Sequence, residues 1–320
     1  MQETTQPLPN FFIAGAPKTG TTSLYRYLKQ HPQIYMSPVK EPCYFASEVR
    51  LDRFSETFEA GAGTKSRRLR QFIRGCMNDV DPGGIVADWE DYVELFKNVD
   101  RQTVIGEASV CYLWSPTAAL NIRARIPEAK IVIILRDPAE RAFSQYLQYA
   151  ANGLVKHSFR EQIERSARNT SRVFDPLYPF LEYGLYYRQV KTYLEVFPRA
   201  NIRIYWYEEA WSDPLAFLKE VFRHLNVDSE FVPNVSARAL ERRAPRSVAA
   251  YYLLARSGIA PRLKALAPTA AWNGVRALLS KPPGSLRMHA SDRKYLCDFY
   301  REDVRKLSSL LNRDLEAWLT

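Results

Sequence analysis

The chain has 320 residues, of which 45 are Lys or Arg and 35 are Asp or Glu, so its formal net charge is +10. With 46% hydrophobic and 25% charged residues it has the composition of a globular protein, which excludes a disordered chain, a collagen and a coiled coil. Its four cysteines lie far apart without a C-x-x-C spacing, so we expect neither a disulfide scaffold nor a zinc knuckle. The positive charge favours an anionic ligand but does not define its class.

The amino-terminal sequence and the hydropathy bear on location. The first 20 residues lack a basic start followed by an apolar run, so we expect no secretory signal. No stretch approaches the roughly 18–20 apolar residues that span a bilayer, so we expect no integral membrane segment. These features favour a cytoplasmic protein with reduced thiols, and they do not define an oligomeric state.

Short apolar runs alternate with helical patterns along the chain. In chain order, the patterns predict a strand at Phe11–Gly15, a helix at Thr21–Gln30, a strand at Thr103–Gly106, a helix at Pro116–Ile126, a strand at Lys130–Leu135, helices at Pro138–Ala151 and Gly184–Phe197, a strand at Asn201–Trp206, and helices at Asp213–Leu225 and Arg293–Leu311. The run KIVIIL has no polar break, as in a parallel strand that is covered on both faces. The alternation predicts an α/β fold, with a P-loop-type parallel sheet flanked by helices on both faces.

We find no clear linker and predict one domain over residues 1–320. Its core would span about 10–230, and a helical lid and C-terminal helices would span about 231–320. The least regular stretches are Ala46–Ile85 and Ser236–Leu286, which we expect to be lids and substrate-facing insertions.

The segment Gly15–Thr22 (GAPKTGTT) lies between the first predicted strand and the first predicted helix. Its two glycines allow the backbone to wrap around an anion, and the helix that follows directs its free N–H groups at that anion. A Walker A loop has its lysine directly after the second glycine. Here Thr21 occupies that place, and the lysine is Lys18, inside the loop. We therefore predict an anion-binding loop that is not a magnesium–nucleoside triphosphate loop; the alternative is a strand–helix turn without a ligand.

Arg136 directly follows the predicted strand Lys130–Leu135, and Ser144 lies eight residues later, about two helical turns along. The carboxyl ends of parallel strands face the ligand crevice, where an arginine can bind a phosphate through paired donors. Arg136 and Ser144 are therefore candidates for a second phosphate site. An ion pair at the start of the helix is the alternative for Arg136-Asp137-Pro138.

Together these motifs resemble those of the sulfotransferases that use PAPS (3′-phosphoadenosine 5′-phosphosulfate). Gly15–Thr22 is similar to the 5′-phosphosulfate loop of that family, and Lys130–Ser144 is similar to its 3′-phosphate motif. Lys40–Phe45 (KEPCYF) resembles the Lys-Glu-Pro-His-Phe-Phe stretch of heparan-sulfate-type sulfotransferases, and Gly106–Leu113 (GEASVCYL) resembles their Glu-Lys-Thr-Pro-x-Tyr-Phe stretch. The resemblance covers most of residues 10–230 and implies the sulfotransferase fold.

The resemblance also implies roles for individual residues. Glu41 would be the general base; the alternative for Glu41 is a surface carboxylate paired with Lys40. Lys18 would be the cation at the leaving oxygen. PAPS would be the co-substrate and PAP (adenosine 3′,5′-bisphosphate) the product, without a metal ion. The cofactor-binding residues that it implies are Lys18, Thr19, Gly20, Thr21, Thr22, Arg136 and Ser144, with Arg242, Arg243 and Arg246 from a late basic loop.

Two positions depart from the heparan-type pattern. Cys43 stands where that group has histidine, and Ala108 stands where it has lysine. Those positions face the sugar in the heparan-type enzymes, so the acceptor is not carried over. Because the chain shows no membrane anchor of the kind found in animal Golgi members, we group it with soluble bacterial-type sulfotransferases.

Two other features have two interpretations each. The basic run Lys65–Arg70, with Arg74 beyond it, would either steer an anionic acceptor or form a solvated helix face. Trp89 and Tyr92 would either line an acceptor cleft or belong to the core.

The sequence therefore predicts an enzyme that transfers a sulfuryl group from PAPS to a hydroxyl of a carbohydrate, glycolipid or hydroxylated natural product, with N-sulfation left open. Its partners would be a small-molecule or glycan acceptor and no nucleic acid. One alternative is a P-loop kinase with a degenerate Walker motif, against which the displaced Lys18 argues. The other is a non-catalytic nucleic-acid-binding protein, for which we find no stacking aromatics and no recognition helix.

Overall fold

The computed structural model describes residues 6–56, 68–77, 84–236, 244–257, 280–281 and 287–320. The chain forms two compact units. The first unit combines Met1–Arg136 with Tyr186–Ala239, and the second combines Asp137–Leu185 with Leu240–Thr320. The sequence-based prediction that residues 1–320 form a single domain stays a prediction.

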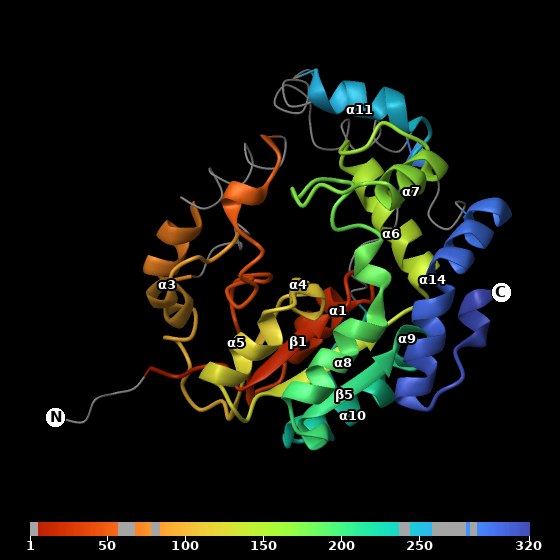
Figure 1. Cartoon of the computed structure of the whole chain (residues 1–320). Helices are drawn as coiled ribbons and strands as arrows, with labels where there is room; N and C mark the ends of the chain where they lie inside the picture. The colour runs from red at the N-terminus through yellow and green to blue at the C-terminus, as the bar shows by residue number, and fades with distance from the viewer. Residues whose placement is uncertain (1–5, 57–67, 78–83, 237–243, 258–279, 282–286) are drawn as a thin grey trace. The chain divides into compact units, whose positions relative to one another are not determined.

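Five strands form the sheet of the first unit, in the order β2-β3-β1-β4-β5 (Figure 1). Each neighbouring pair is parallel. Every residue of the central strand β1 is buried, as is every residue of β4 except Lys130, so these strands are covered on both faces and show no polar alternation. The bounds are β1 (Phe11–Gly15), β2 (Ile34–Met36), β3 (Val104–Ala108), β4 (Lys130–Leu135) and β5 (Ile202–Trp206).

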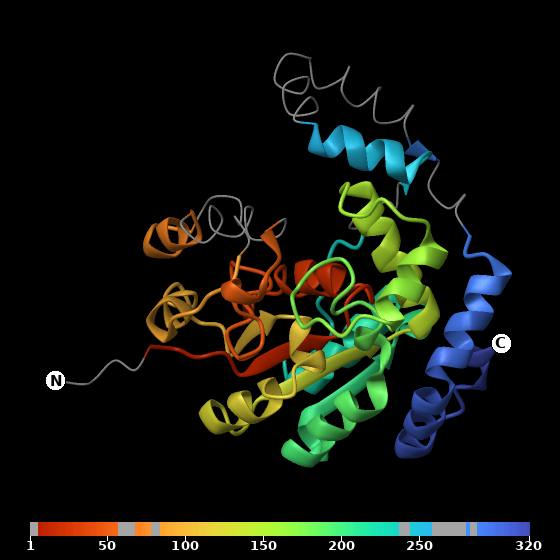
Figure 2. The same ribbon diagram turned by 45° about the horizontal axis from the view of Figure 1, so that its top comes forward.

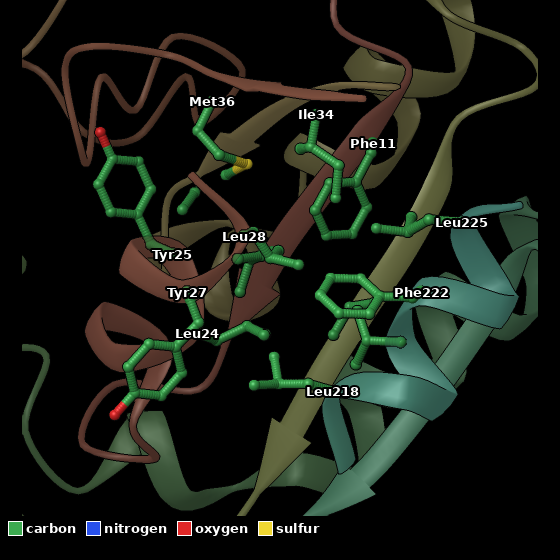
Figure 3. Packing of buried hydrophobic residues seen from close by; sticks show 14 of the residues in the cluster. Phe11, Leu24, Tyr25, Tyr27, Leu28, Ile34, Met36, Leu218, Phe222 and Leu225 are labelled. Atoms are coloured by element: carbon green, nitrogen blue, oxygen red, sulfur yellow. The ribbon is translucent and has the colours of Figure 1, made fainter. Parts of the chain in front are cut away.

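One face of the sheet is apolar. Successive side chains of a strand point to opposite faces, and Phe11 and Ile13 of β1 pack in a cluster with α1 (Thr21–Leu28) and α10 (Pro214–Leu225) (Figure 3). Full burial of one such side chain contributes about 1.5–3 kcal/mol to folding. The residues that α1 and α10 add to this cluster include Leu24, Tyr27, Leu28, Leu218, Phe222 and Leu225.

The opposite face is aromatic and carries a buried carboxylate. The ring of Phe12 lies 5.7 Å from that of Phe45 and 6.3 Å from that of Tyr112. The register of β1 and β3 pairs Phe12 with Glu107, so these two side chains share this face. The helices that cover it are α4 (Cys111–Trp114), α5 (Ala118–Arg125) and α8 (Tyr186–Val196) (Figure 2).

The other described elements of the first unit are η1 (Leu51–Arg53), a helix over 68–74, α3 (Trp89–Glu94), η3 (Arg199–Asn201) and α9 (Tyr207–Ser212). The second unit is mainly helical in its described part. Asp137 starts its first helix by accepting hydrogen bonds from the N–H groups of Ala139 and Glu140, with Pro138 in the first turn. Its elements are α6 (Pro138–Ala151), α7 (Phe159–Ala167), η2 (Glu182–Gly184), β6 (Ala244–Pro245), α11 (Val248–Arg256), β7 (Ser280–Lys281), α14 (Ala290–Leu311) and η4 (Glu316–Leu319).

The predicted elements are confirmed, most of them with ends that differ by one to three residues. The bounds of the strands Phe11–Gly15 and Lys130–Leu135 and of the helix Pro138–Ala151 agree with the prediction. The strand β2 was not predicted, because three residues are too few to show a period. The helix α7, which begins with the capping box of Ser158 and Glu161, was not predicted either. Parts of both predicted insertions, 46–85 and 236–286, lie outside the described residues.

Candidate active site

Three neighbouring strands carry the candidate site residues of the first unit at their carboxyl ends. The central strand β1 leads into the loop with Lys18, β4 leads into Arg136, and the end of β3 holds the segment with Glu41 through the bond from the Glu41 N–H to the Ala108 carbonyl, 2.9 Å long. The carboxyl ends of neighbouring parallel strands lie at one edge of a sheet, where ligands of such folds bind. The fold therefore brings these three predicted site residues to one edge.

The loop after β1 is held in shape by its own polar groups. The Thr19 side chain is fully buried, and its hydroxyl donates to the Ala16 carbonyl over 2.7 Å. Gly20 has a φ of +83°, in the left-handed region that favours glycine. A Cβ atom there would lie 2.4 Å from the indole nitrogen of Trp211, which donates to the Thr19 carbonyl over 3.0 Å. Gly20 is thus required both by its backbone angle and by the close approach of Trp211.

The loop carries N–H donors at the start of α1 and one lysine. Thr21 and Thr22 begin α1, and the first N–H groups of a helix have no acceptor within that helix. No acidic residue lies in the first turn of α1, so the positive end of the helix dipole is not offset there. Lys18 is half-buried, and its φ of +69° is uncommon for a residue with a side chain.

Arg136 lies against this loop. It is only 5% exposed, and its Nη1 donates to the Lys18 carbonyl over 3.4 Å. Its guanidinium carbon lies 4.5 Å from the centre of the Tyr207 ring, at the start of α9. A cation over a ring face is held in place by about 0.5–2 kcal/mol, so the Tyr207 ring and the loop together fix the guanidinium.

Glu41 has partners for both carboxylate oxygens. Its Oε1 forms an ion pair with Lys40, and its Oε2 accepts a hydrogen bond from the Val110 N–H over 2.7 Å. The side chain is 33% exposed, so the ion pair with Lys40 does not close it off from a substrate. Because each carboxylate oxygen has two lone pairs, Oε1 can still accept a proton.

Strained backbone is concentrated at this edge of the sheet. Lys18, Glu41 and Cys43 have φ values of 69°, 65° and 57°, and left-handed backbone costs residues with a side chain about 1–3 kcal/mol each. Such strain persists only where surrounding bonds fix the chain. The strained positions therefore mark the loop and the Lys40–Phe45 segment as regions whose conformation is imposed by their neighbours.

The carboxylate of Glu107 is fully buried beneath this edge. It accepts hydrogen bonds from Ser109 Oγ (2.6 Å), Tyr92 Oη (2.8 Å) and Tyr112 Oη (2.9 Å). Burial raises the pKa of Glu107 to about 7, against the three hydroxyl donors, which lower it. Nearby, the thiols of Cys43 and Cys111 are both buried, and burial raises the pKa of Cys111.

The remaining predicted binding residues belong to the second unit or lie outside the described residues. Ser144 is buried on α6, and Arg246 is exposed just before α11. Arg242 and Arg243 lie outside the described residues. Their contacts with a cofactor stay predictions.

The structure also describes the aromatic pair Trp89 and Tyr92 and most of the basic run at 65–74. Tyr92 is a fully buried core residue whose ring stacks on those of Trp89 and Tyr44. In the basic run, Arg70 pairs with Asp88 and Asp91, and Arg74 also pairs with Asp91. Carboxylates therefore offset these two arginines; Lys65 lies outside the described residues.

In the described part of the chain, no group of three or more His, Cys, Asp or Glu side chains is arranged to hold a metal ion. No helix among the described residues has both the length and the apolar character that a membrane crossing requires.

The parallel sheet and its anion-type loop define a P-loop-type α/β protein, as predicted from the sequence. The model of the Sulfotransferase family matches residues 9–231, and this chain belongs to that family. A crystal structure of a sulfotransferase from Alicyclobacillus acidocaldarius is 30% identical, with a TM-score of 0.71, and the alignment covers 98% of this chain and 100% of that one. The predicted family and fold are both confirmed.

Curated relatives match over part of their length. Carbohydrate sulfotransferase 15 of Mus musculus is 28% identical over 272 residues, which cover 69% of this chain and 44% of that protein. The bifunctional heparan sulfate N-deacetylase/N-sulfotransferase 3 of Homo sapiens is 29% identical over 231 residues, which cover 71% of this chain and 23% of that protein. The chain therefore spans less than half of either relative.

Three residues that shape this edge, Trp211, Tyr207 and Glu107, were not predicted as site residues from the sequence. Trp211 and Tyr207 lie about 190 and 70 residues from the groups they touch, so only the folded chain shows that they hold the loop and Arg136. Glu107 was part of a recognised stretch, and an acidic residue inside an apolar strand run was the signal that could have identified it.

Proposed function

We propose that this chain transfers a sulfuryl group from PAPS to a hydroxyl group of a carbohydrate, glycolipid or hydroxylated natural product. The observation that carries the proposal is the arrangement at the sheet edge, where Lys18, Arg136 and Glu41 follow or contact three neighbouring strands. Family membership supports the reaction class. The names of the relatives support a carbohydrate acceptor, and one of them leaves N-sulfation open.

The donor set fits a ligand with two anionic ends. Backbone N–H groups at the start of α1, together with the Lys18 ammonium, suit a 5′-phosphosulfate. The guanidinium of Arg136 has the planar geometry that binds a phosphate through two donors, and it suits the 3′-phosphate that distinguishes PAPS from ATP. Ser144 and Arg246 remain sequence-based predictions for binding of the same 3′-phosphate. The cytoplasmic location of the protein also stays a prediction.

When bound, PAPS supplies an activated sulfuryl group on a good leaving group. Glu41 accepts the proton of the acceptor hydroxyl as the new O–S bond forms and the bridging S–O bond breaks. Lys18 stabilises the negative charge that develops on the bridging oxygen, which leaves as part of PAP. The fixed N–H groups of the loop orient the transferred group, so most of the rate enhancement comes from position and charge.

A transfer assay with radiolabelled PAPS tests this proposal. The acceptors are desulfated heparin, chondroitin, a glucosyl lipid and p-nitrophenol. We expect transfer to at least one of these by the wild type and a loss of about 10²–10⁴-fold in kcat for Glu41→Gln, with PAP affinity unchanged. Glu128→Gln, at a carboxylate that is 84% exposed, is the control. Equal turnover in Glu41→Gln and wild type would remove Glu41 as the base.

Thermal denaturation separates the two alternative functions. A ligand that binds only the folded chain raises the melting temperature. We expect PAP and PAPS to raise it, and neither Mg²⁺–ATP nor an oligonucleotide to do so. A shift with Mg²⁺–ATP alone would favour the kinase, and a shift with the oligonucleotide alone would favour the nucleic-acid-binding protein.

A further inference from the structure

The segment that carries Glu41 is fixed by hydroxyl groups that belong to another part of the chain. The Cys43 N–H donates to Ser109 Oγ over 3.0 Å, and the Phe45 N–H donates to Tyr112 Oη over 3.3 Å. Both hydroxyls also donate to the buried carboxylate of Glu107. Two continuous chains of hydrogen bonds therefore run from Glu107 to the backbone beside Glu41.

A hydroxyl has one hydrogen, so the acceptor of that hydrogen decides where its lone pairs point. A carboxylate only accepts, and the carboxylate of Glu107 therefore takes the hydrogens of both Ser109 and Tyr112. Their lone pairs are left for the two N–H groups of the segment. A glutamine at position 107 would direct an N–H₂ donor at one of these two hydroxyls. That hydroxyl could then no longer donate its hydrogen to residue 107, and its lone pairs would turn away from the N–H group of the segment.

The two chains end where the backbone is strained. Glu41 and Cys43 both have left-handed φ values, so this conformation depends on bonds from outside the segment. Ser109 is also directly followed by Val110, whose N–H donates to Glu41 Oε2. Displacement of the Ser109 hydroxyl would therefore disturb Glu41 in two ways. It would release the Cys43 N–H, and it would shift the Val110 N–H that holds the Glu41 carboxylate.

We infer that Glu107 is a positioning residue for the reaction: through Ser109 and Tyr112, its carboxylate holds the Lys40–Phe45 segment so that Glu41 points at the acceptor. This inference rests on the proposed role of Glu41. Because Glu107 is fully buried, it would act through Ser109 and Tyr112 and not on the acceptor itself.

Two tyrosine substitutions provide a matched test. Tyr112→Phe removes a hydroxyl that belongs to the chains of hydrogen bonds. Tyr35→Phe removes a half-buried hydroxyl that donates to the Leu95 carbonyl, and the strand register places Tyr35 on the same face of the sheet as Glu107. We expect kcat to fall about 10–100-fold for Tyr112→Phe and Ser109→Ala, since a misplaced catalytic group costs about that much, with KM for PAPS unchanged. Tyr35→Phe is expected to keep the wild-type kcat.

A double mutant separates positioning from general loosening of the fold. If Ser109 acts through Glu41, Ser109→Ala is expected to lower kcat in the wild type but to have no further effect in the Glu41→Gln background. The assay uses radiolabelled PAPS with the most rapidly sulfated of the four acceptors, at pH 8, above the pKa of Glu107. Melting temperatures confirm that each variant is folded.

The outcomes distinguish this inference from the proposed function. Wild-type kcat in both Ser109→Ala and Tyr112→Phe, with a loss in Glu41→Gln, overturns the inference and leaves the base in place. A full additional loss for Ser109→Ala in the Glu41→Gln background overturns it as well. Wild-type kcat in Glu41→Gln removes the proposed base and this inference with it.

Discussion

The two faces of the sheet differ in what their buried groups do. On the face of α1 and α10, Phe11, Ile13 and Phe222 pack as apolar side chains. On the other face, the ring of Phe12 lies beside a buried carboxylate that accepts three hydroxyl hydrogen bonds. The apolar face contributes stability alone, whereas the polar face gives up some stability to hold a strained segment. Substitutions on the two faces should therefore have different effects.

Truncation on the apolar face should affect stability and not chemistry. Phe222→Ala removes a fully buried ring from α10 and is expected to cost about 3–5 kcal/mol of unfolding free energy in urea. Leu215→Ala, on the same helix but 40% exposed, is the control and should stay within about 0.5 kcal/mol. The kcat of the folded fraction should be unchanged in both. A tenfold lower kcat for folded Phe222→Ala would show that this face also serves the site.

The polar face should make stability depend on pH in one direction. The pKa of Glu107 is about 7 in the folded chain and 4.5 ordinarily, so the folded state holds the proton more tightly. Its contribution is fully present below pH 4.5 and is lost as pH rises through 7, by about 3 kcal/mol. Urea unfolding at pH 5 and 8 should show this fall in the wild type and not in Glu107→Gln. An equal change in unfolding free energy between pH 5 and pH 8 in the wild type and in Glu107→Gln would contradict this assignment to Glu107.

A histidine on α10 should act in the opposite direction. Burial, with Arg203 and Lys130 nearby, lowers the pKa of His224 to about 4, from 6.5. The folded state therefore disfavours the protonated ring, and stability is lost as pH falls from 6.5 toward 4, by about 2 kcal/mol after solvent screening. His224→Gln should remove this loss in unfolding measurements at pH 4.5 and 7. A wild-type acid slope in that variant would exclude His224 as its source.

Trp211, on α9, packs against the apolar cluster but also makes a polar contact with the loop that follows β1. Trp211→Phe keeps an aromatic ring against Tyr27 and Phe217 and loses the hydrogen bond to the Thr19 carbonyl. We expect about 1 kcal/mol weaker binding of PAP by calorimetry, the contribution of one hydrogen bond. Tyr205→Phe, whose ring packs against the same Phe217, is the control. Equal PAP affinity in all three proteins would show that the indole N–H does not set the loop.

Local patterns predicted most of the fold. The run KIVIIL and the loop GAPKTGTT are continuous in the sequence, so their strand and anion-binding characters could be predicted without neighbours. The face to which Glu107 points depends on its register with Phe12, and its three hydroxyl partners come from α3, α4 and the end of β3. Such contacts join distant segments, and no spacing in the sequence predicts them.

The site shows the same division. Lys18, Glu41 and Arg136 could be found because each lies in a short motif that resembles a known one. The residues that hold them do not lie in those motifs: Tyr207 lies under Arg136, and Trp211 lies against Gly20. These aromatic residues contact the site only because the chain folds, so a local sequence motif does not reveal them.

Calorimetric titration with PAP and with adenosine 5′-monophosphate, which lacks the 3′-phosphate, tests whether Lys18 and Arg136 bind the two anionic ends of one ligand. The wild type should bind PAP at one site and much more tightly than the monophosphate. Arg136→Ala should bind both about equally, and Lys18→Ala should bind both more weakly, because each substitution removes the cation at one end of the ligand. Absence of PAP binding by the wild type, or the same preference for PAP in Arg136→Ala, would contradict the account.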